Sequence, residues 1–109
     1  MPPKRYEIII DEENKIFVYF LTAIGEVGKF VVKYLAEIEG KTFEIVRYDV
    51  GHGQPHIDIL NAHGQTKEKR WLGFLDNSEA LTLAIEDIKA NYLLYRKRFI
   101  TWLKKEERK

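Results

Sequence analysis

The chain has 109 residues, of which 45% are hydrophobic, 32% are charged and none is cysteine. This length fits one domain, residues 1–109, and the composition excludes a disordered chain. The lack of cysteine excludes disulfides, thiolate zinc sites and cysteine nucleophiles. The formal net charge is only +1, which excludes a polycation that binds nucleic acid over its whole surface.

The apolar runs are far shorter than the roughly 18 residues that a membrane-spanning helix requires. Residues 1–5 (MPPKR) precede a strand-like segment that three acidic residues interrupt, a pattern unlike a signal peptide. We therefore expect a cytoplasmic protein with no membrane partner.

The first part of the chain, about residues 5–74, predicts β-strands. Short runs rich in β-branched and aromatic residues alternate with polar or glycine-containing turns. The expected strands cover residues 6–10, 16–22, 30–39, 42–48, 56–60 and 66–72. The segment Glu39-Gly40-Lys41 is typical of a hairpin turn. The pattern predicts an antiparallel meander of five or six strands.

The hydrophobic period changes after residue 76. Asp76 and Glu79 have the spacing of a capping box. A stripe of seven apolar side chains then recurs at alternating intervals of four and three, which predicts a helix over about residues 78–105 with this stripe in the core. Its members are Leu81, Ile85, Ile88, Tyr92, Tyr95, Phe99 and Trp102. The expected fold is α+β, with the meander packed against one long C-terminal helix.

A second apolar set occupies another side of this helix. Leu93, Ile100 and Leu103 lie roughly 80–120° around the helix axis from the first stripe. They predict a contact with another protein, most simply a homodimer through the outer face of the helix. The alternative is ordinary scattered surface apolar residues.

Candidate catalytic residues gather between Arg47 and Asp58. All three histidines of the chain fall within residues 52–63. On a strand, His56 and Asp58 would point to the same face because they are two residues apart. We expect His52 and Asp49 on the turn before that strand, where glycines can fold the backbone back over it.

Three interpretations of this segment stay open. In the first, His52 and His56 transfer protons, Arg47 stabilises a negative charge, and Asp49 or Asp58 orients an imidazole. In the second, His52, His56 and Asp58 bind a divalent metal. In the third, the segment is structural: Asp49 caps a turn and the histidines bond to the backbone. No cofactor is expected under the first and third.

Further candidate binding residues flank this segment. Tyr48 adjoins Asp49, and the helix presents Asp87, Asn91, Tyr95 and Arg98 in one ridge. If the sheet carries Arg47–Asp58 on the face that the helix covers, Tyr48, Asn91, Tyr95 and Arg98 could bind substrate in one pocket. Elsewhere Lys67, Lys69 and Arg70 adjoin Trp71, a combination that can bind single-stranded nucleic acid. The alternative is that Trp71 is a core residue.

The run VRYDVGHGQPHID (residues 46–58) and the helix pattern EALTLAIEDIKANYLLYRKRF (residues 79–99) resemble a family of short uncharacterised prokaryotic proteins. Those proteins share a VRYD-x-x-HG-x-x-H-x-D core. Arg47-Tyr48-Asp49 and the nearby histidines are also similar to the TumE-like toxins of toxin–antitoxin modules, in which asparagine is usual at the place of Val50. This second resemblance implies a toxin that acts on RNA and is encoded beside an antitoxin.

The sequence thus predicts a toxin-like protein of a prokaryotic toxin–antitoxin or defence module, in which a His pair cleaves RNA. The alternative is a non-catalytic interaction module that forms a small homodimer.

Overall fold

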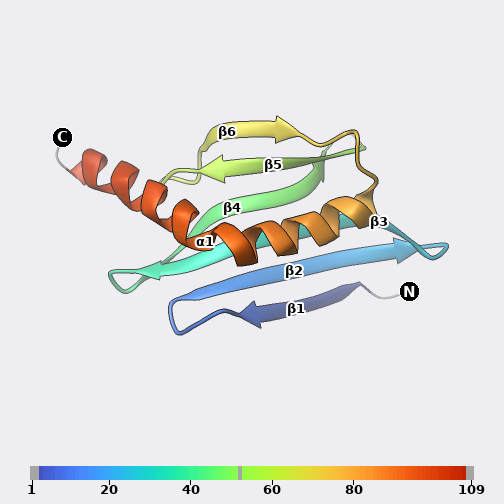
Figure 1. The fold of residues 1–109 in the computed structure, drawn as a ribbon, viewed down its shortest axis with the longest axis horizontal. Coiled ribbons are helices and arrows are strands. Elements are labelled where there is room, and N and C mark those ends of the chain that lie inside the picture. The colour runs from blue at the N-terminus through green and yellow to red at the C-terminus, as the bar shows by residue number, and fades with distance from the viewer. Residues whose placement is uncertain (1–2, 52, 108–109) are drawn as a thin grey trace.

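The computed structural model describes residues 3–51 and 53–107. Each strand pairs antiparallel with the next, in the order β1-β2-β3-β4-β5-β6, and the helix α1 crosses one face of this sheet (Figure 1). The elements are β1 (Lys4–Ile9), β2 (Asn14–Ala23), β3 (Glu26–Ile38), β4 (Lys41–Gly51), β5 (Gln54–Leu60), β6 (Thr66–Trp71) and α1 (Asn77–Glu107). The predicted α+β fold is confirmed, with six strands in the meander.

Two tight turns fix the pairing of the long central strands. Glu39 and Gly40, between β3 and β4, both have positive φ angles, 52° and 79°. Ile24 and Gly25, between β2 and β3, have 53° and 76°. Positive φ at both central residues defines the type I′ turn, whose twist matches that of paired strands. The hairpin predicted at Glu39-Gly40 is therefore confirmed.

The helix begins where the sequence predicts. The backbone N–H of Glu79 donates to Asp76 Oδ1 over 2.7 Å, and the N–H of Asp76 donates to Glu79 Oε1 over 3.1 Å. This reciprocal pair is a capping box. Of the predicted stripe, Ile88, Tyr95 and Phe99 are buried, and the other members pack partly buried against the core.

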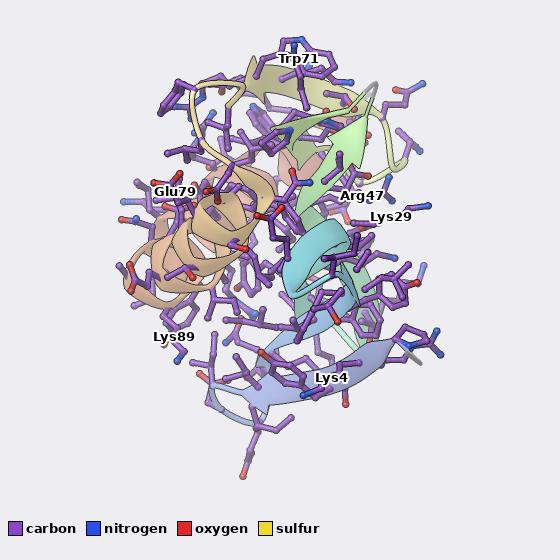
Figure 2. All side chains as sticks on the ribbon, turned by 90° about the vertical axis from the view of Figure 1, so that its right-hand side faces the viewer. Lys4, Lys29, Arg47, Trp71, Glu79 and Lys89 are labelled. Carbon is purple, nitrogen blue, oxygen red and sulfur yellow. The ribbon has the colours of Figure 1, made fainter. Side chains whose placement is uncertain are left out.

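One face of the sheet forms the core with α1. Alternate residues of β2 and β3 point toward the helix and are buried, as the two-residue period of strands requires. They are Ile16, Val18, Phe30, Val32, Tyr34 and Ala36. The helix packs on β3, β4 and β5. We call the opposite side the open face; Lys29 and Arg47 point from it, away from α1 (Figure 2).

A β-bulge in β4 decides which of its residues reach the open face. Val46 pairs with Tyr34 and Glu44 pairs with Leu35, so Ile45 is an extra residue without a partner on β3. The Phe43 ring meets the Phe99 ring of α1, and the Tyr48 hydroxyl also bonds to α1. The bulge thus shifts the alternation by one residue between Phe43 and Tyr48.

The outer side of α1 carries a different apolar set from the predicted one. Leu93 is 64% exposed as expected, but Ile100 and Leu103 are partly buried against the core. Leu94 is 56% exposed and Leu83 is 39% exposed. Among the residues that the structure describes, no helix is long and apolar enough to span a bilayer.

Candidate functional site on the open face

Strand pairing brings three of the predicted site residues together. Asp49 of β4 lies directly opposite His56 of β5, and Asp58 follows two residues along β5. Tyr48, the neighbour of Asp49, points toward α1, so Asp49, His56 and Asp58 point the other way. Asp49 lies within β4 and not on the expected turn, because β4 extends to Gly51.

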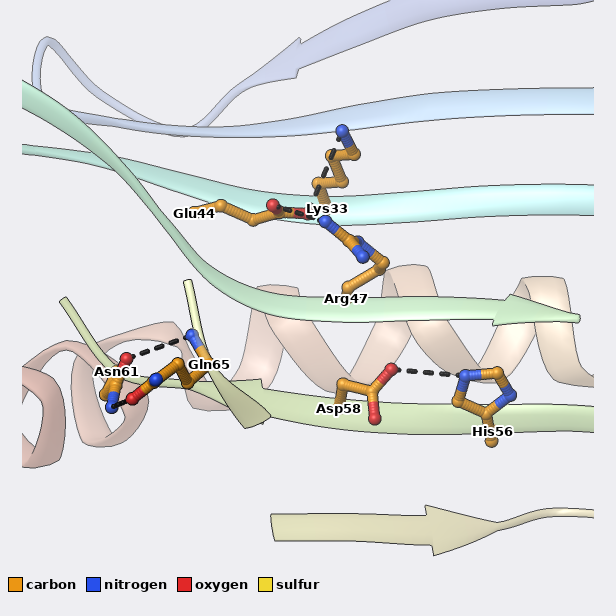
Figure 3. A network of polar contacts seen from close by, with 7 residues as sticks. All are labelled: Lys33, Glu44, Arg47, His56, Asp58, Asn61 and Gln65. Atoms are coloured by element: carbon orange, nitrogen blue, oxygen red, sulfur yellow. Dashed lines mark hydrogen bonds and ion pairs between the residues drawn. The ribbon is translucent and has the colours of Figure 1, made fainter. Parts of the chain in front are cut away.

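Both carboxylates approach the same nitrogen of the imidazole. His56 Nε2 lies 2.7 Å from Asp49 Oδ1 and 3.1 Å from Asp58 Oδ2. Of these two contacts, the one with Asp58 has the geometry of a hydrogen bond (Figure 3). The side chains of His56 and Asp58 are 7% and 8% exposed, whereas that of Asp49 is 27% exposed. Asp49 is therefore the member of this cluster that solvent reaches.

Several polar atoms of the cluster are buried without a hydrogen bond. Within residues 3–51 and 53–107, Asp49 Oδ1, Asp58 Oδ1 and His56 Nδ1 have no hydrogen-bond partner. Lys69 Nζ is 3.6 Å from Asp58 Oδ1, an ion pair beyond hydrogen-bond length. Buried polar groups are almost always paired, since leaving one unpaired costs about 1–3 kcal/mol. Asp49 Oδ1 still contacts His56 Nε2 at 2.7 Å, so His56 Nδ1 and Asp58 Oδ1 are the unpaired atoms that point to a functional role.

The edge strand β6 borders the cluster with an aromatic ring and a cation. The Trp71 ring centroid lies 4.9 Å from that of His56, and Lys69 Nζ lies 5.3 Å from the Trp71 centroid. Trp71 is 46% exposed, so the interpretation of this residue as core is wrong. On the other side, a Cβ added to Gly51 would lie 3.0 Å from His56 Cε1. Gly51 thus leaves the room that the imidazole occupies.

Arg47 lies on the same face without touching the imidazole. It pairs across the sheet with Asp58, but its guanidinium donates to Glu44 through Nε at 2.8 Å and Nη2 at 2.7 Å. These hydrogen bonds raise the pKa of Arg47 further above its usual range. Lys33 Nζ also approaches Glu44, at 3.8 Å (Figure 3). Glu44, which sequence reasoning missed, holds Arg47 beside the cluster.

The predicted binding residues Tyr48, Asn91 and Tyr95 gather on the other side of the sheet. The hydroxyls of Tyr48 and Tyr95 each donate to Asp87 Oδ2 over 2.6 Å. Asn91 donates to Asp87 Oδ1 over 2.8 Å. This Asp87 cluster joins α1 to β4, and the sheet separates it from His56. The condition for one shared pocket is therefore not met.

Arg98 and His63 lie apart from both clusters. Arg98 Nη2 donates to Glu68 of β6 over 3.1 Å on the helix side. His63, in the turn after β5, has Nε2 3.0 Å from Glu106 Oε2 near the end of α1. His52 lies outside the described residues, so its expected role and its place in the predicted metal site stay predictions. His56 bonds to the Asp58 carboxylate and contacts that of Asp49, whereas the structural interpretation had the histidines bond to the backbone.

The chain belongs to the DUF7718 family, a domain of unknown function whose model matches residues 1–105. No curated protein and no solved structure matches the chain.

Proposed function

We propose that this member of the DUF7718 family is a toxin-like protein of a prokaryotic toxin–antitoxin or defence module that cleaves RNA on its open face. The observation that supports this is the position of the Asp49–His56–Asp58 cluster beside the exposed Trp71 and Lys69. A buried cluster of ionisable groups next to a solvent-exposed aromatic and a cation combines a reaction centre with a surface for a nucleotide.

Trp71 and Lys69 would bind the substrate. A base stacks on an exposed aromatic ring without regard to its identity, which contributes about 1–3 kcal/mol per base. Lys69, whose side chain is 42% exposed, would meet the adjacent phosphate. Arg47, held by Glu44, supplies a second cation on the same face.

The cluster would accept a proton through Asp49. Asp49 Oδ1 faces His56, which leaves Oδ2 for the 2′-hydroxyl of a bound ribose. As the 2′-oxygen forms its bond to phosphorus, its proton passes to Asp49 and the bond to the 5′-oxygen breaks. His52, one residue beyond β4, would protonate that leaving oxygen. The products are a 2′,3′-cyclic phosphate and a free 5′-hydroxyl.

This reaction can be tested with an unstructured RNA oligonucleotide and two analogues, one of DNA and one with 2′-O-methyl ribose. We expect purified protein to cleave the RNA into fragments with 2′,3′-cyclic phosphate ends and to leave both analogues intact. Cleavage of the DNA analogue would refute the 2′-hydroxyl mechanism. Intact RNA at high protein concentration would refute the proposed function.

Substitutions on the open face give the matched comparison. Asp49→Asn should reduce cleavage at least a hundredfold, whereas Glu37→Gln, an exposed carboxylate on the same face, should leave it unchanged. Trp71→Ala should weaken RNA binding, and Phe74→Ala, which removes a ring that is 79% exposed beyond β6, should not. If both variants of a pair lost cleavage or RNA binding equally, the loss would come from general damage to the protein and not from the site.

In a bacterial host, controlled expression of the chain should arrest growth while total RNA is degraded, and the Asp49→Asn chain should do neither. A toxin of this kind acts in the cytoplasm and requires an antitoxin as its protein partner. Normal growth with intact RNA at high expression would favour the second candidate function.

That second candidate is an interaction module that forms a homodimer through the outer side of α1. At about 100° per residue, Leu83, Ala90, Leu93 and Leu94 share one exposed stripe opposite the core. The stripe is acidic before this apolar centre and basic after it. Its charged members are Glu79, Glu86, Lys97 and Lys104.

Two copies fit each other if their helices run antiparallel. When Ala90 of one copy faces Leu93 of its partner, Glu86 faces Lys97 and Glu79 faces Lys104. Opposite charges then meet at both ends of an apolar centre, an arrangement that favours this register over a parallel one.

Charge exchange tests this dimer. Light scattering should show a dimer for the unmodified chain, a weaker one for Glu86→Lys, and recovery for Glu86→Lys combined with Lys97→Glu. A monomeric unmodified chain would refute the second candidate.

A further inference from the structure

The two carboxylates of the open-face cluster converge on one ring nitrogen. In a proton relay of the Ser-His-Asp kind, a carboxylate binds one nitrogen of the imidazole and the second nitrogen faces the reacting group. Here Asp49 and Asp58 both approach Nε2, at 2.7 and 3.1 Å, and Nδ1 is buried beside Gly51. This geometry differs from a relay and matches ligands around a shared positive charge.

The charges of the cluster also favour a cation. Asp58 is more than nine-tenths buried, and its Oδ1 has no hydrogen-bond partner among the described residues. Among the described lysine and arginine side chains, Lys69 Nζ lies nearest to Asp58, 3.6 Å from its Oδ1, and Arg47 is engaged with Glu44. Two carboxylates of which one is buried require more compensation than one half-exposed ammonium group provides.

We infer that Asp49, His56 and Asp58 bind one divalent metal ion, with Asp49 in place of the His52 ligand that the sequence predicted. Each of the three residues offers one ligand atom, a ring nitrogen or a carboxylate oxygen, and these atoms lie within 4.8 Å of one another. Metal–ligand bonds of about 2.0–2.2 Å place neighbouring ligands roughly 3 Å apart, close to the observed separations. One imidazole and two carboxylates suit Mn²⁺ or Zn²⁺, and three protein ligands leave positions for water or a phosphate oxygen.

The proposed binding of the ion rests on the geometry alone, whereas a part of the ion in RNA cleavage rests on the proposed function. The full chain is therefore titrated with Mn²⁺ alone, and free Mn²⁺ is followed by its electron paramagnetic resonance signal. We expect one site per chain. Asp58→Asn and Asp49→Asn should each weaken binding at least about tenfold, and Glu37→Gln should not.

A second readout reports the place of the ion. In a Trp102→Phe chain, Trp71 is the remaining tryptophan, and its ring lies 4.9 Å from the His56 ring. Mn²⁺ bound at the cluster should quench the fluorescence of Trp71, and Asp58→Asn should shift this quenching to at least about tenfold higher Mn²⁺ concentration. Asparagine is close in shape to aspartate, and circular dichroism without metal establishes that the Asp58→Asn chain is folded.

The outcomes separate this inference from the proposed function. Saturable binding that Asp58→Asn removes, without RNA cleavage, supports the metal site and refutes the proposed function. RNA cleavage that persists in excess chelator, with no Mn²⁺ or Zn²⁺ bound, refutes the metal site and leaves the proposed function standing. Binding that is the same in Asp58→Asn and Asp49→Asn also overturns the inference.

Discussion

The two faces of the sheet each hold a polar cluster built around aspartate, and the two clusters differ in how their atoms are paired. On the helix side, Asp87 accepts hydrogen bonds from Tyr48, Tyr95 and Asn91, so both of its oxygens have donors. On the open face, Asp49 and Asp58 each keep one buried oxygen without a hydrogen bond among the described residues.

We attribute a structural role to the paired cluster and, under the proposed function, a catalytic role to the unpaired one. A fully paired cluster stabilises the fold, because each hydrogen bond to a charged group contributes about 1.5–3 kcal/mol. An incompletely paired cluster costs stability, and its residues are held in place by the pairing of β4 with β5 and by the Trp71 ring. If stability and function divide between the two faces, substitutions at Asp87 change mainly stability and substitutions at Asp49 and Asp58 change mainly function.

The largest change in stability is expected at Asp87. Asp87→Ala leaves the hydroxyls of Tyr48 and Tyr95 without their acceptor between α1 and β4, which should lower the free energy of unfolding by about 3 kcal/mol. Urea denaturation measures this loss. Asp87→Asn keeps an acceptor oxygen and should lose about half as much, and Glu86→Ala, at an exposed neighbour, should stay within about 0.5 kcal/mol. A loss below about 1 kcal/mol for Asp87→Ala would remove the distinction between the faces.

The helix-side tyrosines should make the fold sensitive to alkaline pH. Burial raises the pKa of Tyr34 to about 12, and burial with the hydrogen bond to Asp87 raises the pKa of Tyr48 and Tyr95 above their ordinary value. Above pH 10 these tyrosines ionise in the unfolded chain before they do in the fold. The contribution of each tyrosine to stability is thus fully present below about pH 10 and then falls by about 1.4 kcal/mol per pH unit.

Denaturation at pH 8, 10 and 11 measures this fall. In Tyr48→Phe the stability at pH 8 is lower, because the bond to Asp87 is lost, but the decrease between pH 10 and 11 should be smaller than in the unmodified chain. An equal decrease would show that Tyr48 ionises as readily in the fold as in the unfolded chain.

Most of the fold was predictable because its signals are local. The apolar stripe of α1, the Asp76–Glu79 capping box and the Glu39-Gly40 turn each lie within a few residues of sequence, and the structure bears out all three. The bulge at Ile45 has no such signal. Strict alternation along β4 would place Arg47 and Asp49 on the same face as Phe43, which packs against Phe99 of α1.

The candidate site shows the same limit. The residue types between Arg47 and Asp58 identified the segment, but long-range pairing decides which side chains meet. Asp49 joins His56 because β4 extends to Gly51 and pairs with β5 in that register. Tyr48 points away from Asp49 because adjacent strand residues face opposite sides of the sheet. Its hydroxyl donates to Asp87, some forty residues later in the chain.

A small change in stability is expected on the open face. Asp58→Asn removes a buried charge whose Oδ1 lacks a donor among the described residues, and the loss of its bond to His56 offsets the gain. The free energy of unfolding without metal should change by less than about 1 kcal/mol, while Mn²⁺ binding weakens at least about tenfold. Urea denaturation and the Mn²⁺ titration give the two values. A loss as large as that of Asp87→Ala would make this cluster structural as well.

The smallest and most local change is Gly51→Ala. Its new methyl group would lie 3.0 Å from His56 Cε1 and 3.4 Å from Nδ1, so the imidazole must shift by a few tenths of an ångström. The backbone of Gly51 does not have positive φ, and the fold should lose less than about 1 kcal/mol. Gly28→Ala, whose methyl group would meet only a backbone oxygen at 3.9 Å, is the control in β3. If the position of His56 sets the chemistry of the open face, Gly51→Ala weakens Mn²⁺ binding and RNA cleavage while Gly28→Ala changes neither. Equal behaviour of the two variants would mean that the imidazole is not part of the working site.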